Sequence, residues 1–200
     1  MKNILLITGL IFILTACTGV KKVNYVTIEE TDSLDRKALK TSLSEYTEAT
    51  VANDVEKLVH FMYSKVFTIV SKETMVNNLV KAYATGKIPQ VTNVKHLNIS
   101  SVKKYNEGLY AVINSSMTTS LKSPKEDSAF ESYMLEMLKN KIGSKGTVTF
   151  NKKSHQFHIN HSNQTLALTE NNQWKFIGFQ QAKKYMKKNI LPLELKKVIQ

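Results

Sequence analysis

The spacing of apolar residues changes at Pro89, and no other feature of the sequence constrains the fold as much. Before this proline, apolar residues recur every three or four positions, which is the period of an amphipathic helix. After it they recur at every second position, which is the period of a strand with one buried face. Helices followed by a run of strands indicate an α+β domain, in which helices pack on an antiparallel sheet.

Three helices are expected before Pro89. The first has its apolar face at Leu39, Leu43, Tyr46 and Thr50. Asp54 is placed to cap a second helix whose apolar positions are Val55, Leu58, Val59 and Met62. Ser71 is placed to cap a third helix that ends at Gly86, because glycine accepts the left-handed conformation that often follows a helix.

Long antiparallel strands are expected after Pro89. The ranges Val94–Lys104 and Leu109–Leu121 are joined by the turn Tyr105–Gly108, and the apolar alternation of the first range is interrupted near Ser100, which indicates a bulge. Further strands are expected at Thr147–Phe150, His155–His161, Thr165–Thr169 and Trp174–Phe179.

Two further helices are expected among and after these strands. Ser128 and Glu131 match a capping box, and the helix that they begin ends at Gly143. The C-terminal segment predicts a basic helix that is interrupted near Pro192. Its lysines are Lys183, Lys184, Lys187, Lys188, Lys196 and Lys197.

This layout resembles the nuclear transport factor 2-like superfamily, also called cystatin-like α+β. The resemblance covers Asp35 to Phe179. It rests on the helical pattern Tyr46…Ala49…Asn53-Asp54…Leu58…Phe61…Tyr63 and on the ending Asn171-Asn172-Gln173-Trp174-Lys175-Phe176. It implies N-terminal helices packed on a strongly bent, cone-like antiparallel sheet with a pocket at its open end. Members of that superfamily use the pocket for catalysis, for binding or for dimerisation, so the fold does not select the function.

The N-terminus resembles the signal of a bacterial lipoprotein. Lys2 precedes the eleven-residue apolar run Ile4–Leu14, which as a helix spans about 16 Å, about half of a bilayer's hydrocarbon core. The run ends in Leu14-Thr15-Ala16-Cys17, which resembles a lipobox. In that motif the cysteine thiol receives a diacylglyceryl group, the chain is cut before it, and the new amino terminus is often acylated. An ordinary cleaved signal with an incidental cysteine is the alternative.

The expected organisation therefore has three parts: a signal peptide at 1–16, a lipid-anchored tether at 17–35, and a single domain at 36–200 with a basic C-terminal helical tail. Cys17 is the single cysteine, so no intrachain disulfide supports the domain. Thr18 rather than Asp follows it, and by analogy with lipoprotein sorting in diderm bacteria we expect the periplasmic face of the outer membrane.

Six residues are candidates for lining a pocket: His60, Tyr63, His96, Tyr110, Phe157 and Trp174. Enzymes similar to ketosteroid isomerase and scytalone dehydratase place Asp or His on pocket-facing strands of this fold. The strands expected here contain no carboxylate, so a general base with a raised pKa has no expected position. We therefore assign no catalytic residue and expect no cofactor.

Three histidines follow one another at a spacing of three: His155, His158 and His161. On a strand, where side chains alternate between faces, His158 points away from the other two. A zinc site needs its ligands to converge, so we expect no metal and interpret these residues as solvated strand histidines.

The chain is basic, with 28 Lys and Arg against 16 Asp and Glu and a net charge of +12. Nucleic acid is not an expected partner, because Arg36 is the sole arginine and bidentate recognition of phosphate and guanine depends on arginine. A lysine-rich end held near a bilayer is expected to contact anionic headgroups. An ordinary solvated lysine face is the alternative.

Together these features predict a lipid-anchored cell-envelope protein whose domain binds a ligand or partner without transforming it. The ligand expected in the cone is an apolar or amphipathic small molecule. Its expected apolar lining is Leu109, Ala111, Ile113, Met117, Phe157, Ile159, Leu166 and Leu168. Two alternatives stay open: a pocket enzyme of isomerase, dehydratase or hydrolase type, and a structural lipoprotein that assembles, for example as a homodimer, through its sheet face.

Overall fold

The computed structural model describes residues 33–86, 88–106 and 108–199. The signal peptide expected at 1–16 and the lipobox-like sequence that ends in Cys17 lie outside the described residues, as does most of the tether expected at 17–35. The first described helix begins at Ser33, three residues before the expected start of the domain at 36. None of the helices in the described ranges is long and apolar enough to cross a bilayer.

The three expected N-terminal helices are present, and a short 3-10 helix lies between the second and third. They are α2 (Ser33–Ala52), α3 (Val55–His60), η2 (Ser64–Thr68) and α4 (Lys72–Ala84). Asp54 caps α3 by accepting the Lys57 amide at 3.1 Å, as predicted. Ser71 caps α4 in the same way, and Gly86 follows that helix with a φ of 62°.

The second helix is shorter than its apolar spacing predicted, because the chain leaves the helix to pair with the sheet. The helix α3 ends at His60, and the Phe61 carbonyl accepts a hydrogen bond from the Phe176 amide at 2.8 Å. Met62 therefore lies beyond the helix on which it was expected.

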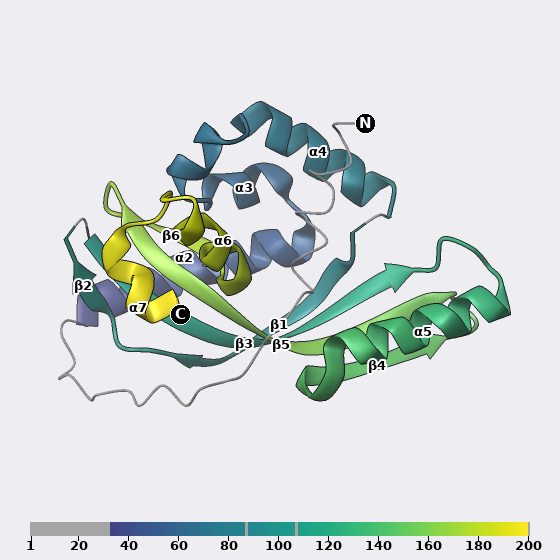
Figure 1. Ribbon diagram of the computed structural model, residues 1–200. Coiled ribbons are helices and arrows are strands. Elements are labelled where there is room, and N and C mark those ends of the chain that lie inside the picture. Colours follow the sequence, from purple (N-terminus) through teal and green to yellow (C-terminus); the bar gives the residue numbers. More distant parts are fainter. Residues whose placement is uncertain (1–32, 87, 107, 200) are drawn as a thin grey trace.

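Six antiparallel strands form one sheet with the order β1-β3-β5-β4, in which β2 pairs with β3 and β6 pairs with β5. They are β1 (Gln90–Ile99), β2 (Lys103–Tyr105), β3 (Gly108–Lys122), β4 (Gly146–Asn151), β5 (Gln156–Glu170) and β6 (Gln173–Gly178). The long strands β3 and β5 pair from Tyr110↔Leu168 to Lys122↔Gln156 and form the spine of the sheet. The sheet is strongly curled, as predicted (Figure 1).

Two strand boundaries differ from the prediction. The strand expected over Val94–Lys104 is divided into β1 and β2, since Ser100 leaves the strand pattern and bonds Val112 through its amide and its hydroxyl, each at 2.9 Å. The strands expected at His155–His161 and Thr165–Thr169 are one strand, β5, because β3 offers an equally long partner.

One half of the sheet is covered by helices on both faces, and we call it the two-sided half. It comprises β2, β6 and the segments of β3 and β5 that pair with them. On one face, Ile113 and Phe176 cluster with Leu39 of α2. On the other face, Leu166 and Leu168 cluster with side chains of α6 (Phe179–Lys187), η4 (Leu193–Leu195) and α7 (Lys196–Ile199). The C-terminal helix is thus interrupted near Pro192, as predicted.

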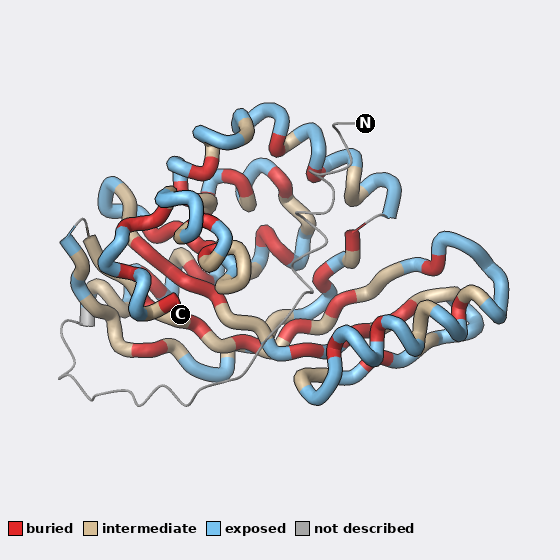
Figure 2. Tube along the Cα trace, in the orientation of Figure 1, coloured by how far each residue is buried: buried red, intermediate tan, exposed pale blue. Residues whose placement is uncertain are grey.

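The other half of the sheet carries helices on one face, and we call it the one-sided half. It contains β4, most of β1 and the remaining lengths of β3 and β5. The helix α5 (Ser128–Ile142) packs Leu138 and Ile142 against Val148, Phe157 and Ile159. Figure 2 shows the difference: buried residues follow one another along β6 and the end of β5, and alternate with exposed ones at the start of β5.

Candidate functional site

The candidate site is the face of the one-sided half that lies opposite α5, which we call the polar sheet face. Its residues on β3 are Asn114, Ser116, Thr118 and Ser120, and on β5 they are Gln156, His158, Asn160, Ser162 and Gln164. Those on β4 are Thr147, Thr149 and Asn151, and those on β1 are Asn93 and Lys95. All are exposed or half-buried, and none belongs to a hydrophobic cluster of the described chain.

The pairing of the strands places these side chains in rows. Thr118 lies opposite Asn160, which in turn lies opposite Thr147, so one row crosses three strands. Neighbouring strands are about 4.8 Å apart, and same-face residues repeat about every 6.7 Å along a strand. The face is therefore a regular two-dimensional array of side chains.

The array consists almost entirely of hydroxyl and amide groups, which both donate and accept hydrogen bonds. Two of its hydrogen bonds join neighbouring strands: Ser116 Oγ donates to Asn160 Oδ1 at 2.9 Å, and Gln164 Nε2 donates to Asn114 Oδ1 at 2.8 Å. The residues that define the face include no carboxylate, and its fixed charges are Lys95 and, at the end of β3, the exposed Lys122 that pairs with Gln156. Such an array can hydrogen-bond an extended polar partner but supplies no acid and base pair.

His96 joins α2 to the sheet instead of lining a pocket. Its Nε2 lies 2.9 Å from Thr47 Oγ1 of α2, and its Nδ1 lies 2.9 Å from Ser115 Oγ of β3. Burial lowers the pKa of His96, since the protonated ring would lose hydration. Both ring nitrogens are occupied by hydroxyl groups, so neither is free to act as a base.

His161 is buried, and the expectation that it is a solvated strand histidine is wrong. It is 6% exposed, and neither ring nitrogen has a hydrogen-bond partner in the described part of the chain. Thr119 Oγ1, on the same sheet face, is likewise buried without one. Burial lowers the pKa of His161, so the neutral ring is favoured. The side chain lies on the face that α5 covers, opposite Met117 and Gly146.

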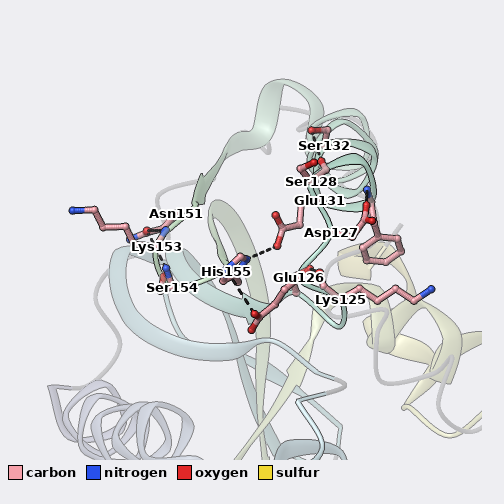
Figure 3. Close-up of polar contacts among 12 residues, drawn as sticks. Lys125, Glu126, Asp127, Ser128, Glu131, Ser132, Asn151, Lys153, Ser154 and His155 are labelled. Atoms are coloured by element: carbon pink, nitrogen blue, oxygen red, sulfur yellow. Dashed lines mark hydrogen bonds and ion pairs between the residues drawn. The ribbon is translucent and has the colours of Figure 1, made fainter.

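His155 is not the solvated strand histidine that was expected, because it lies in the turn before β5 and contacts two carboxylates. The three side chains form a polar cluster at the tip of the one-sided half (Figure 3). His155 Nδ1 lies 2.7 Å from Glu131 Oε1, and Nε2 lies 3.9 Å from Glu126 Oε2. Because both ring nitrogens face carboxylates, the cluster ties the β4–β5 turn to α5 and does not present a base to a substrate. In the described ranges no group of three His, Cys, Asp or Glu is arranged to hold a metal ion.

The same cluster explains why the expected capping box is absent. Asp127, not Ser128, is the N-cap of α5, and its side chain accepts the Phe130 amide at 2.8 Å. Glu131, expected to complete the box, is buried and bonds His155 instead.

The candidate pocket residues do not gather around one cavity. His60 is exposed at the end of α3, and Tyr63 is buried in the cluster that also receives half-buried Tyr110. Phe157 lies under α5, and Trp174 lies in the cluster beneath α2. The apolar residues expected to line the cone are also distributed among these clusters, and the fully buried ones are packed against helices.

A cleft of about 240 Å³ lies at the end of α5 beside the edge strand β4. It is lined by Lys139, Ile142, Gly143, Gly146, Thr147 and Val148. None of the six candidate pocket residues lines it.

Lys175 is a buried cation that the sequence did not single out. Its Nζ donates to the His60 carbonyl at 2.9 Å and to Gln173 Oε1 at 3.1 Å. Burial lowers its pKa. The bond to His60 attaches β6 to the end of α3, so we interpret Lys175 as a structural residue.

Sequence reasoning missed the polar sheet face, although its signal was present. We followed the apolar positions of Leu109–Leu121, whereas the alternate positions carry Asn114, Ser116, Thr118 and Ser120. That series has neither charges nor apolar residues, which is unusual in a chain with 22% charged residues.

Comparison of the chain with models of protein families and with the sequences of characterised proteins gave no match.

Proposed function

We propose that this is a lipid-anchored cell-envelope protein whose domain binds a polar partner through the polar sheet face without transforming it. The observation that carries the proposal is that face: four strands present hydroxyl and amide side chains that no described helix covers. Anchoring through Cys17, and the position at the periplasmic face of the outer membrane, are supported by the lipobox-like sequence.

The non-catalytic part of the proposal is supported by the state of the histidines. His96 is held by two hydroxyl groups, His155 is held between two carboxylates, and His161 is buried. A general base must reach the proton that it abstracts, and none of these three rings is placed to do so. His158 lies on the polar sheet face itself, where none of the residues that define the face is a carboxylate that could orient its ring.

We also propose that the domain belongs to the nuclear transport factor 2-like superfamily. The order of three helices followed by a curled antiparallel sheet supports this. The layout differs from the expected cone in one respect: the inner face is filled by α2 and α5, so the surface left for binding is the opposite face of the one-sided half.

Site-specific photo-crosslinking in cells tests the polar sheet face. A photoreactive amino acid is placed at Asn160 on this face or, as a matched control, at Asn77, an exposed asparagine of α4. We expect an adduct of defined mass from position 160 and none from position 77. Equal labelling at both positions, or no adduct from 160, contradicts the proposal.

The anchor is tested separately by intact-mass analysis and membrane fractionation. We expect the wild-type chain to carry acyl groups on Cys17 and to sediment with membranes, and Cys17→Ser to lack the acyl mass. A wild-type chain without acyl groups would refute the anchor and leave the polar sheet face untouched.

A further inference from the structure

Segments that are far apart in the sequence meet at the free end of the two-sided half, which we call the basic end. The first turns of α2 lie there, because Leu39 and Leu43 cluster with Leu109 at the start of β3. The β2–β3 hairpin and η4 meet there too, since Asn106 Nδ2 donates to Glu194 Oε1 at 2.5 Å. Figure 1 shows the purple start of α2, β2 and α7 together at the left end of the molecule.

Each of these segments contributes a pair of lysines. They are Lys37 and Lys40 on α2, Lys103 and Lys104 on β2, and Lys196 and Lys197 on α7. All are exposed except Lys103, which is half-buried. In the described residues, the acids nearest these lysines in the sequence are Asp35 in the first turn of α2 and Glu194 of η4, and the latter is hydrogen-bonded to Asn106. Glu45 and Glu48 lie further along α2, and Glu107 follows β2 in the sequence. The basic end is therefore strongly cationic, although its charges come from three separate parts of the chain.

The basic end is also where the chain from Cys17 reaches the domain. The helix α2 begins at Ser33, so fifteen residues lie between it and Cys17. Even fully extended, such a segment spans at most about 55 Å. A lipid on Cys17 would thus keep the start of α2, and with it these lysines, within about 55 Å of a bilayer surface.

We propose that the basic end binds the headgroups of anionic phospholipids and so orients the domain on the membrane. Each lysine near an anionic surface strengthens binding about fivefold, and several act together within a Debye length. In this orientation the one-sided half points away from the bilayer, and the polar sheet face is open to a partner. The orientation rests on the proposed lipid anchor, whereas the affinity for anionic lipid does not.

Vesicle binding tests this surface without the anchor. The chain without the expected signal peptide, residues 17–200 carrying Cys17→Ser, is mixed with vesicles of phosphatidylcholine alone or with an equal part of phosphatidylglycerol, and bound protein is measured by sedimentation. We expect binding to the anionic vesicles only, and its loss at about 1 M salt, where the Debye length is about 3 Å.

The location of the surface is tested by two variants with the same change in charge. The first replaces Lys103, Lys104, Lys196 and Lys197 by Gln, and the matched control replaces Lys141, Lys145, Lys152 and Lys153 of the one-sided half. We expect at least about tenfold weaker binding for the first variant and little change for the control. Equal losses in the two variants, or no binding by the parent chain, would overturn the proposal.

The orientation is tested with polarity-sensitive dyes. Since Cys17 is the single cysteine, Lys197→Cys or Lys153→Cys in the Cys17→Ser background gives a single labelling site. We expect an apolar shift of emission on anionic vesicles for position 197 and none for position 153. The reverse pattern would refute the orientation. Failure of acylation at Cys17 in cells, with these results intact, would refute only the anchor.

Discussion

The two halves of the sheet are built from the same two long strands, yet they differ in how many faces are covered. In the two-sided half, consecutive residues of β5 from Thr165 to Leu168 are buried, because α2 and the C-terminal helices cover opposite faces. In the one-sided half, Phe157 and Ile159 are fully buried whereas Asn160 is exposed. The alternation of burial along one strand therefore reports the number of layers that cover it.

The two halves also differ in the size of their hydrophobic clusters. Helices on both faces supply the two-sided half with most of the apolar core, and the largest hydrophobic cluster is found there. The one-sided half has a smaller cluster under α5, and its opposite face is the one on which we propose that a partner binds. We therefore expect the one-sided half to open more easily than the two-sided half, since local stability follows the number of buried apolar contacts.

The largest expected effect comes from removing a buried ring in each half. Phe157→Ala and Phe176→Ala should each cost about 3–5 kcal/mol, since both rings are buried. Hydrogen exchange of backbone amides distinguishes the two variants. With Phe157→Ala we expect α5 and β4 to lose protection first while β6 stays protected. With Phe176→Ala we expect amides in both halves to lose protection. Uniform loss in both variants would show that the halves unfold as one unit.

The next effect concerns the hydrogen bond between Glu131 and His155 at the tip of the one-sided half. Glu131→Gln should cost about 1–3 kcal/mol in urea unfolding, because Glu131 is buried against His155 and its charged hydrogen bond at 2.7 Å is weakened. Glu136→Gln, at the exposed pair with Lys139, is the matched control and should change stability by less than about 0.5 kcal/mol. Equal costs for the two variants would mean that burial adds nothing to this tie.

A smaller, pH-dependent effect is expected at His161. Burial lowers its pKa in the folded chain below the ordinary 6.5, so the unfolded chain binds more protons between these two values. The free energy of unfolding is therefore unaffected by protonation of His161 above about pH 6.5 and decreases as the pH falls from 6.5 towards the folded pKa. The total decrease is about 1.4 kcal/mol for each unit by which burial lowers that pKa.

His161→Phe should therefore flatten the dependence of the unfolding free energy on pH below 6.5. His60→Phe, at an exposed ring, controls for the loss of a histidine. An unchanged pH dependence in His161→Phe would show that the ring is accessible to protons in the folded chain.

The smallest effect distinguishes two neighbouring caps of α5. Asp127→Ala should cost about 1 kcal/mol, because its carboxylate accepts the Phe130 amide and lies at the positive end of the helix. Ser128→Ala should cost less than about 0.5 kcal/mol, because Ser128 is the first helical residue and not the cap. The two costs, measured by thermal unfolding, would be reversed if the capping box expected from the sequence were formed.

Local interactions account for what could be predicted. Asp54 and Ser71 cap their helices through amides three residues away, and Gly86 ends a helix through its own backbone, so each signal lies within one short segment. The alternation of apolar residues in β3 follows from strand geometry in the same way. Such features depend little on the rest of the chain.

Features that require distant partners could not be predicted. Glu131 matches a capping box in the local sequence, but in the structure its carboxylate bonds His155, which is 24 residues away. His161 is a strand residue in any register, but whether it is solvated depends on where α5 packs. The six candidate pocket residues were selected by type, and their positions in separate clusters follow from helix packing.

The sequence by itself determined the order of helices and strands, most of their caps and the α+β class, because period, capping and turn chemistry act over a few residues. The curl of the sheet was expected from the resemblance to a superfamily and not from these local signals. Only the tertiary structure decided which face of each strand is covered. It also decided that lysines from α2, β2 and α7 share one end, and that the polar residues of β1, β3, β4 and β5 form one open face. The physical reason is that layer packing and strand register bring together residues more than a hundred positions apart, and no local pattern encodes those pairs.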